Sequence, residues 1–176
     1  MKQRQGVLLL AATVVFASQA CQKSTPTRPD GSASAPAEQP SLDAWGATLG
    51  IPKGFHTEQN DTGGWEMTDG KIVILVGRHE LPEGTTATAF FEERRQALSS
   101  YGAVDMSAVK TTPLGRGTAI AATGRATSEG GEVQLRLAAT RLGPRAGLSL
   151  LMIHEPRSRA RADETWRTLL QGTHLP

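Results

Sequence analysis

The chain has 176 residues, of which 19 are Lys or Arg, 17 are Asp or Glu and one is Cys. A single cysteine excludes an internal disulfide framework, so a folded domain must depend on its apolar core. Lys2 and Arg4 account for the whole net charge of +2, and the other 17 basic residues balance the 17 acidic ones. A nucleic-acid-binding surface needs a basic excess and is therefore not expected.

Residues 1–20 predict a signal peptide. Two basic residues precede an apolar run from Gly6 to Phe16, and small residues follow that run. This order is typical of secretory signals, and the run is shorter than the roughly 20 residues that a membrane-spanning helix needs. Cleavage after Ala20 would make Cys21 the first residue of the mature chain.

The stretch Ser18-Gln19-Ala20-Cys21 resembles the signal of bacterial lipoproteins. The resemblance implies a diacylglyceryl group on the Cys21 thiol and an acylated amino terminus, and two or more acyl chains anchor a protein stably to a membrane. That family usually has leucine or another aliphatic residue where this chain has Ser18. Gln22 after the cysteine implies the outer membrane under Gram-negative sorting rules. The alternatives are a secreted soluble protein and an uncleaved amino-terminal anchor.

Residues 21–40 predict a disordered tether that follows the lipidated cysteine. The stretch is rich in Ser, Thr, Ala and Pro and contains no large apolar residue. Such a segment buries too little surface to offset the entropy of ordering it. If flexible, it reaches roughly 25 Å. The folded part is then expected over residues 41–176, which is enough chain for one domain.

The first half of this domain predicts short strands and then a helix. Ile72, Ile74 and Val76 alternate with Val73 and Leu75, so both faces of that strand are apolar and we expect both to be covered. Thr85 or Thr86 can cap the helix and Gly102 can end it. The predicted strands are 46–51, 55–59, 64–69 and 71–78, and the predicted helix is 86–101.

The second half predicts longer strands and a final helix. The strands are 103–111, 116–127, 132–142 and 146–154, and the helix is 158–171. Glu132 to Leu142 alternates apolar and polar residues, whereas Leu148 to Ile153 is apolar on both faces. The order of elements predicts an α+β domain: one antiparallel sheet of about six or seven strands flanked by two helices.

This layout resembles the PsbP-like, Mog-type α/β/α fold. The features that carry the resemblance are the opening from Gly46 to Phe55, the helix after Arg78, and the hairpin from Glu132 to His154 that leads into a helix containing Trp166. Members bind a small GTPase in eukaryotes, support photosystem II in chloroplasts, or serve bacteria as envelope proteins and secretion chaperones. They share no catalytic residue, so function must be argued from sites.

The sequence contains no complete catalytic or metal-binding spacing. His79 and His154 end two predicted strands, and each precedes a glutamate. They could meet at one edge of the sheet as a ligand or metal site, although surface histidines are the simpler interpretation. Gly147-Leu148-Ser149 lacks the second glycine of a nucleophile elbow, and we expect Ser149 on a partly buried sheet surface. Gly115-Arg116-Gly117 lacks the last glycine of a dinucleotide fingerprint.

Four residues are candidates for contact with a partner. Arg157, Arg159 and Arg161 alternate at the start of the last helix and could meet anionic headgroups or an acidic protein. A solvated helix start is the alternative, although the helix dipole disfavours cations there. Trp65 follows a glycine-rich loop and could form an exposed contact, although a place in the core is the alternative.

Together these observations predict a non-enzymatic lipoprotein of the cell envelope. We expect a neutral domain, attached to the outer membrane through lipid on Cys21, that binds another envelope protein as an accessory or assembly component. No cofactor, metal or nucleic acid is expected. The alternatives are a periplasmic small-ligand-binding module and, less favoured, a hydrolase or metal-binding protein.

Overall fold

The computed structural model describes residues 41–128 and 130–176, so the predicted signal peptide, Cys21 and the tether lie outside the described residues. The strands are β1 (Ser41–Ala44), β2 (Ala47–Gly50), β3 (His56–Gln59), β4 (Trp65–Thr68), β5 (Ile72–Glu80), β6 (Ala103–Met106), β7 (Lys110–Leu114), β8 (Gly117–Ser128), β9 (Gly131–Gly143) and β10 (Ala146–His154). The helices are α1 (Ala87–Ala97) and α2 (Arg159–Gly172), with short 3-10 helices η1 (Leu98–Tyr101) and η2 (Pro156–Ser158) beside them.

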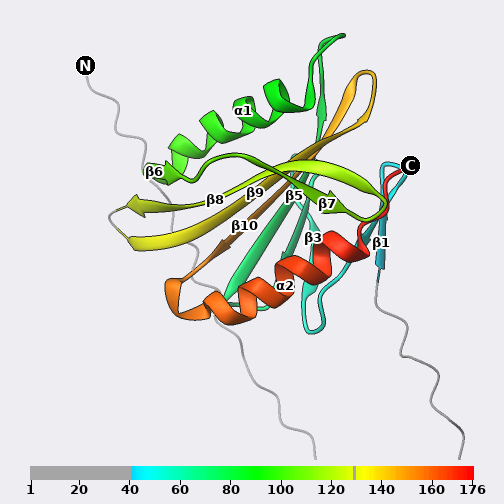
Figure 1. Ribbon diagram of the computed structural model, residues 1–176. Coiled ribbons are helices and arrows are strands. Elements are labelled where there is room, and N and C mark those ends of the chain that lie inside the picture. The colour runs from blue at the N-terminus through cyan, green and yellow to red at the C-terminus, as the bar shows by residue number, and fades with distance from the viewer. Residues whose placement is uncertain (1–40, 129) are drawn as a thin grey trace, which may run out of the picture. The chain divides into compact units, whose positions relative to one another are not determined.

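Eight of these strands form one antiparallel sheet with a helix on each face (Figure 1). The strand order is β3-β4-β5-β10-β9-β8, and both β6 and β7 pair with the outer edge of β8. β1 and β2 form a separate hairpin beside α2. The backbone of Thr48 in β2 exchanges two hydrogen bonds with His174, at 2.9 and 2.7 Å, which joins this hairpin to the end of the chain. The domain is thus a three-layer α/β/α sandwich.

Each face of the sheet has its own apolar core. Along β5, Ile72, Ile74 and Val76 point toward α2, and Leu75 points toward α1, as the period of two in a strand requires. Both faces of the central strands are therefore covered, as the sequence predicts. The α2 face buries residues such as Leu49, Met67, Leu150, Met152 and Leu169, and the α1 face buries Leu81, Phe90, Phe91, Leu98, Leu135 and Leu137.

The predicted α+β class and the two flanking helices are confirmed, and two details differ. The predicted strand 103–111 is divided into β6 and β7 by a bulge. Met106 pairs with Gly124 and Lys110 pairs with Ala121, so the stretch between the two pairs is one residue longer on the β6–β7 side than on β8. Gly124 permits this close approach, since a Cβ there would lie 2.4 Å from the Asp105 carbonyl oxygen. The sequence analysis also missed β1, which is only four residues long and has one fully buried side chain, Ala44.

Candidate functional site: a polar pocket on the α1 face

A pocket of about 280 Å³ lies on the α1 face, near the C-terminal end of that helix. Its floor comes from β5, β9 and β10, and its walls come from α1, η1 and the loop between β3 and β4. The apolar side chains of the lining are Leu75, Ala97, Leu98, Leu137 and Leu151, and the polar lining consists of Asn60, Thr62, His79, Arg94, Ser100, Tyr101 and Ser149. The volume is close to the lower limit of about 300 Å³ for small-molecule sites.

His79 and Ser149 meet on the floor of this pocket because of the strand register. His79 in β5 lies opposite Gly147 in β10, and Gly77 lies opposite Ser149. The two polar residues are therefore diagonal neighbours on one face of an antiparallel pair, where side chains contact each other. The Nε2 atom of His79 lies 2.8 Å from the Oγ atom of Ser149.

Gly77 makes room for this pair, and Gly147 makes room for the Phe90 ring that packs on His79. A Cβ on Gly77 would lie 2.9 Å from Nε2 of His79, and a Cβ on Gly147 would lie 2.5 Å from the ring of Phe90. Phe90 comes from α1, and its ring centre lies 5.3 Å from that of His79. A side chain at either glycine position would push the imidazole or the phenyl ring out of place. The backbone of the floor is thus shaped around His79.

Arg94 covers His79 from the helix. It lies one turn after Phe90 on α1, so both side chains reach the same part of the sheet. Its Nη1 atom lies 3.2 Å from Nδ1 of His79, its guanidinium carbon lies 5.9 Å from the centre of the Phe90 ring, and Nη2 forms a 2.5 Å ion pair with the exposed Glu93. The Nε atom of Arg94 is buried, and no described residue accepts a hydrogen bond from it.

The hydrogen bonds define the tautomer of His79. A guanidinium group only donates, so Nδ1 of His79 must accept the bond from Arg94. In the neutral ring, Nε2 then carries the hydrogen and donates it to Ser149. Burial lowers the pKa of His79, and the charge of Arg94 lowers it further, although Glu93 opposes both effects. The ring is therefore neutral at pH 7, and the hydroxyl hydrogen of Ser149 remains available to another group.

Asn60 and Tyr101 lie at the rim of the pocket. The Oδ1 atom of Asn60 accepts hydrogen bonds from the Thr62 amide and hydroxyl and from the Gly64 amide, at 2.7 to 3.1 Å. This oxygen is occupied by the loop, so the amide NH₂ is the part of Asn60 that can reach a ligand. The Tyr101 side chain is 37% exposed, and burial of its hydroxyl together with the charge of Glu66 raises its pKa. Tyr101 is therefore a neutral phenol at pH 7.

His79 and His154 do not meet, and the simpler interpretation of both as surface histidines is wrong as well, because His154 is buried and His79 is half-buried. β5 and β10 are antiparallel neighbours, so His79 lies opposite Gly147 at one end of the pair and His154 lies opposite Ile72 at the other. His154 also faces α2 rather than α1. It is buried, and its Nδ1 atom donates a 2.8 Å hydrogen bond to the Glu155 carbonyl oxygen. Within residues 41–128 and 130–176, no group of three or more His, Cys, Asp or Glu could hold a metal ion.

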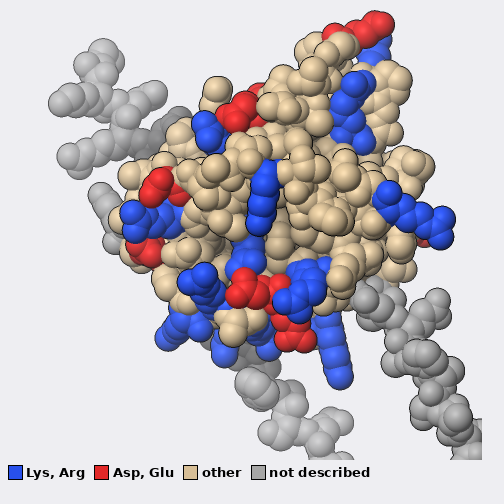
Figure 2. Space-filling view, in the orientation of Figure 1, with Lys and Arg blue, Asp and Glu red and all other residues tan. Residues whose placement is uncertain are grey.

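The candidate contact residues lie on the other side of the molecule. Arg157, Arg159 and Arg161 are exposed at the start of α2, where Lys and Arg gather among acidic residues (Figure 2). Arg157 pairs with Glu155, and Nη2 of Arg161 lies 2.6 Å from Oδ2 of Asp69. Trp65 is half-buried and packs against the core of the α2 face.

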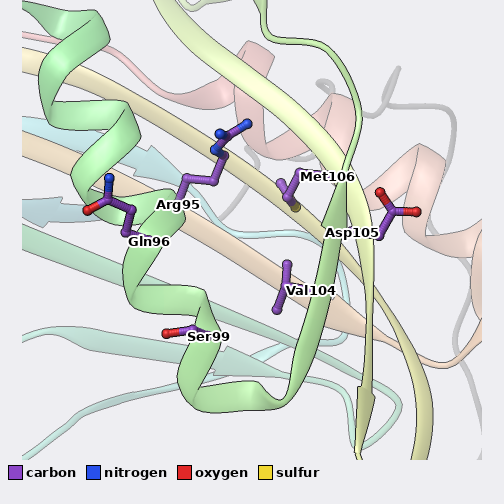
Figure 3. Close-up of a pocket in the computed structure, with 6 residues that line it drawn as sticks. All are labelled: Arg95, Gln96, Ser99, Val104, Asp105 and Met106. Carbon is purple, nitrogen blue, oxygen red and sulfur yellow. The ribbon is translucent and has the colours of Figure 1, made fainter.

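A larger groove of about 580 Å³ separates the end of α1 from β6. Figure 3 shows Val104 and Met106 on the side of β6 that faces the helix, whereas Asp105 points the other way. The charged residues here form ion pairs with neighbours: Arg95 with Glu92 at 2.9 Å and Asp105 with Arg125 at 3.3 Å. Polar groups do not converge in this groove as they do around Ser149.

Comparison with known proteins shows the fold. No protein-family model matches the chain, and no curated protein matches its sequence. The domain has the PsbP-like, Mog-type fold. It superposes on the Ran-binding protein Mog1p of Saccharomyces cerevisiae with a TM-score of 0.57 and 12% identity, over 78% of this chain and 95% of that one.

Two bacterial structures share this fold. LpqN of Mycobacterium tuberculosis, described as involved in cell envelope biogenesis, has a TM-score of 0.59 and 12% identity over 79% of this chain and 91% of that one. The cyanobacterial PsbP of Synechocystis has a TM-score of 0.57 and 10% identity over 84% and 98%. The chain also covers 45% of a longer Bacteroides thetaiotaomicron structure. At such identities the likeness concerns the fold alone, and the expected resemblance in fold is confirmed.

Proposed function

We propose that this protein is a non-enzymatic lipoprotein of the cell envelope whose domain binds another envelope protein as an accessory or assembly component. The observation that carries the non-catalytic part is the hydrogen bond from Arg94 to Nδ1 of His79. A general base for Ser149 would need a free lone pair on Nε2. Arg94 instead holds the hydrogen on Nε2, so the serine receives a hydrogen bond and is not activated.

A fluorophosphonate probe tests the non-catalytic assignment, because it reacts with activated serine nucleophiles. We expect no labelling of the native protein at pH 7. Labelling that disappears in Ser149→Ala would show that the serine is activated and that the assignment is wrong. A serine hydrolase incubated in the same mixture verifies that the probe is active.

The attachment to the membrane rests on the sequence. Cys21 follows the predicted signal peptide and precedes the Ser/Pro/Ala-rich stretch. No helix in the described part of the chain is long and apolar enough to cross a membrane. Metabolic palmitate labelling tests the anchor: we expect the native protein to be labelled and Cys21→Ser to be unlabelled and released from membranes. Equal labelling of the two proteins would contradict lipidation at Cys21.

A partner among envelope proteins is supported by two considerations. The fold occurs in LpqN, involved in cell envelope biogenesis, and in Mog1p, a Ran-binding protein. A membrane tether also raises the local concentration of the domain, so weak contacts are sufficient for assembly. We propose as contact residues the exposed arginines at the start of α2, Arg157, Arg159 and Arg161. Half-buried Trp65, which packs against the core of the α2 face, is a further candidate.

Arg159 is the best position to mutate on this surface. Arg157 and Arg161 have carboxylate partners within the chain, so a substitution of either would also break an ion pair of the domain itself. Cross-linking in intact cells followed by affinity purification should recover one specific envelope protein. Arg159→Glu should reduce that recovery about tenfold, because like charges now oppose each other. The matched control is Arg145→Glu, an exposed arginine in the β9–β10 turn. Equal recovery with Arg159→Glu would remove this surface from the proposal.

A small-ligand-binding module is the second candidate function. The observation that favours it is the pocket itself, in which polar groups converge among apolar walls between the sheet and α1. The two functions are compatible, because the pocket and the arginines of α2 lie on opposite faces of the sheet.

A further inference from the structure

We infer that the pocket on the α1 face binds a small carboxylate with a short apolar body, held by Arg94 and Ser149. This inference goes beyond the proposed partner binding, since it concerns a different face of the sheet. It rests on four features of the pocket: its donors, the buried Nε atom of Arg94, its apolar walls and the glycines that keep it open.

Four polar residues that line the pocket present hydrogen-bond donors, whereas Thr62 and Ser100 give their hydroxyl hydrogens to Asn60 and to the Ala97 carbonyl and therefore present acceptors. Nε2 of His79 gives its hydrogen to Ser149, so the Ser149 hydroxyl points its own hydrogen elsewhere. The oxygen of Asn60 is occupied by three bonds within its loop, which leaves the NH₂ group. Arg94 can only donate, and the neutral Tyr101 phenol can do so as well. A ligand group that satisfies these four donors must bring acceptor oxygens.

The buried Nε atom of Arg94 points to the same chemistry. No described residue accepts a hydrogen bond from it, and a buried donor without an acceptor is unfavourable by about 1–3 kcal/mol. One edge of the guanidinium already bonds to His79 and to Glu93. Guanidinium groups bind carboxylates with two parallel hydrogen bonds. Nε is buried, so a carboxylate in the pocket reaches it only when the Arg94 side chain turns toward the pocket, and this turn would give the nitrogen the partner that the described residues do not provide.

The apolar part of the pocket limits the body of the ligand. Leu75, Leu137 and Leu151 from three adjacent strands form an apolar floor beside Ser149, and Ala97 and Leu98 come from the helix side. A volume of about 280 Å³ corresponds to roughly nine water molecules at about 30 Å³ each. This space suits a short aliphatic or single-ring acid rather than a nucleotide or a long acyl chain.

Two glycines keep the pocket open. A Cβ on Gly64 would lie 2.8 Å from the Val76 carbonyl oxygen, so only glycine lets the β3–β4 loop approach β5 at this point. A Cβ on Gly77 would meet Nε2 of His79 at 2.9 Å and Oγ of Ser149 at 3.4 Å. Residues without side chains therefore hold the loop and the floor in the positions that create the pocket.

Fluorine NMR titration tests the inference with 4-fluorobenzoate as the probe and neutral 4-fluorobenzamide as its matched isostere. We expect the purified full-length protein to bind the acid and to bind the amide at least tenfold more weakly, because charge-assisted hydrogen bonds are about twice as strong. Equal affinities, or no binding of the acid at millimolar concentration, would overturn the inference.

Variants locate the site. Arg94→Gln should weaken binding of 4-fluorobenzoate about ten- to a hundredfold, and Ser149→Ala about two- to tenfold. Tyr101→Phe should weaken binding of 4-fluorobenzoate less than Ser149→Ala does. The Tyr101 hydroxyl lies at the rim and forms no hydrogen bond with another described residue that the substitution would remove. Arg95→Gln is the control, since Arg95 lines the other groove. If circular dichroism shows that Arg94→Gln is unfolded, Ser149→Ala and Tyr101→Phe decide. Unchanged affinity in the folded pocket variants would overturn the inference.

Two sources could supply such a carboxylate: a free small acid or the C-terminus of a protein chain. A tripeptide ending in phenylalanine with a free carboxylate, compared with the same peptide amidated, distinguishes them. Binding of the free-acid peptide in competition with 4-fluorobenzoate assigns a protein C-terminus, and binding of 4-fluorobenzoate alone assigns a small acid. Arg159→Glu should change neither titration, so loss of the pocket and loss of the partner surface are separate results.

Discussion

The buried polar side chains of the two faces of the sheet have different kinds of partner. On the α2 face, His154 and Thr173 bond to the nearby Glu155 and Leu169 carbonyls, and Nε2 of His154 has no partner among the described residues. The ion pairs of this face, Arg136 with Asp163 and Arg161 with Asp69, join α2 to the sheet and to the β4–β5 turn. On the α1 face, His79, Ser149 and Arg94 bond to one another across three elements and open into a pocket. Local bonds of the first kind stabilise a fold, whereas convergent side chains are what a binding site requires.

The largest effect should come from the core of the α2 face. Leu169 in α2 is fully buried, so Leu169→Ala removes apolar contacts and leaves a cavity. We expect the free energy of unfolding to fall by about 2–5 kcal/mol in urea titration. At temperatures where the variant is folded, its affinity for 4-fluorobenzoate should equal that of the native protein. A loss below about 1 kcal/mol would show that this face is not tightly packed.

A medium effect should come from the floor of the pocket. Gly77→Ala places a Cβ 2.9 Å from Nε2 of His79, so the imidazole must move away from Ser149. We expect a loss of about 1–3 kcal/mol and a changed NMR signal of the His79 ring. Gly143→Ala is the control, because nothing lies within 4 Å of its Cβ, and its stability should stay within about 0.5 kcal/mol of the native value. Equal effects of the two substitutions would contradict the geometry of the floor.

Local patterns in the sequence predict most of the sheet and both helices. The double-sided apolar runs of β5 and β10 identify central strands, and Thr86 and Gly102 mark the ends of the first helical segment. Periodicity also puts Ser149 on a partly buried face, and the structure confirms this position. The bulge between β6 and β7 is set by the register with β8, which no local pattern contains.

The pocket could not be predicted because it depends on which strands are neighbours. The sequence places His79 and His154 at strand ends, but only the antiparallel pairing of β5 with β10 separates them and brings Ser149 to His79. In the sequence, Arg94 is one of four consecutive charged residues of the predicted helix, and only the packing of the helix on the sheet shows that it contacts His79. One signal was available: Gly77 and Gly147 interrupt two apolar strands, and glycine inside a strand marks close approach by another group.

A smaller effect should distinguish the starts of the two helices. The Thr86 hydroxyl accepts a 3.1 Å hydrogen bond from the Ala89 amide and caps α1, whereas the Ser158 side chain makes no such bond at the start of α2. Thr86→Ala should therefore destabilise the protein by about 1 kcal/mol, and Ser158→Ala by much less, in thermal denaturation. Similar losses for both would mean that α1 does not depend on its cap.

The pH dependence of stability should compare half-buried His79 on the α1 face with buried His154 on the α2 face. Burial lowers the pKa of His79 and of His154 from the ordinary value of 6.5; Arg94 adds to the effect at His79, and Arg136 and Arg159 add to it at His154. Glu93 opposes the shift at His79, as do Asp163 and the hydrogen bond to Glu155 at His154. The unfolded chain then binds protons more readily than the folded one. The stability that neutral histidines contribute is complete above about pH 6.5 and is lost as the pH falls through the folded pKa values.

Urea unfolding at a series of pH values from 8 to 5 measures this loss. We expect a decline below pH 6.5 that becomes shallower in His79→Gln and remains as in the native protein in His56→Gln, because His56 is exposed on β3. A shallower decline in His79→Gln assigns part of the acid sensitivity to the pocket, since the protonated ring cannot accept the hydrogen bond from Arg94. A decline unchanged by His79→Gln would leave His154 responsible and would mean that the pocket keeps its hydrogen bonds in acid. A native protein of equal stability at pH 8 and pH 5 would contradict the lowered pKa on both faces.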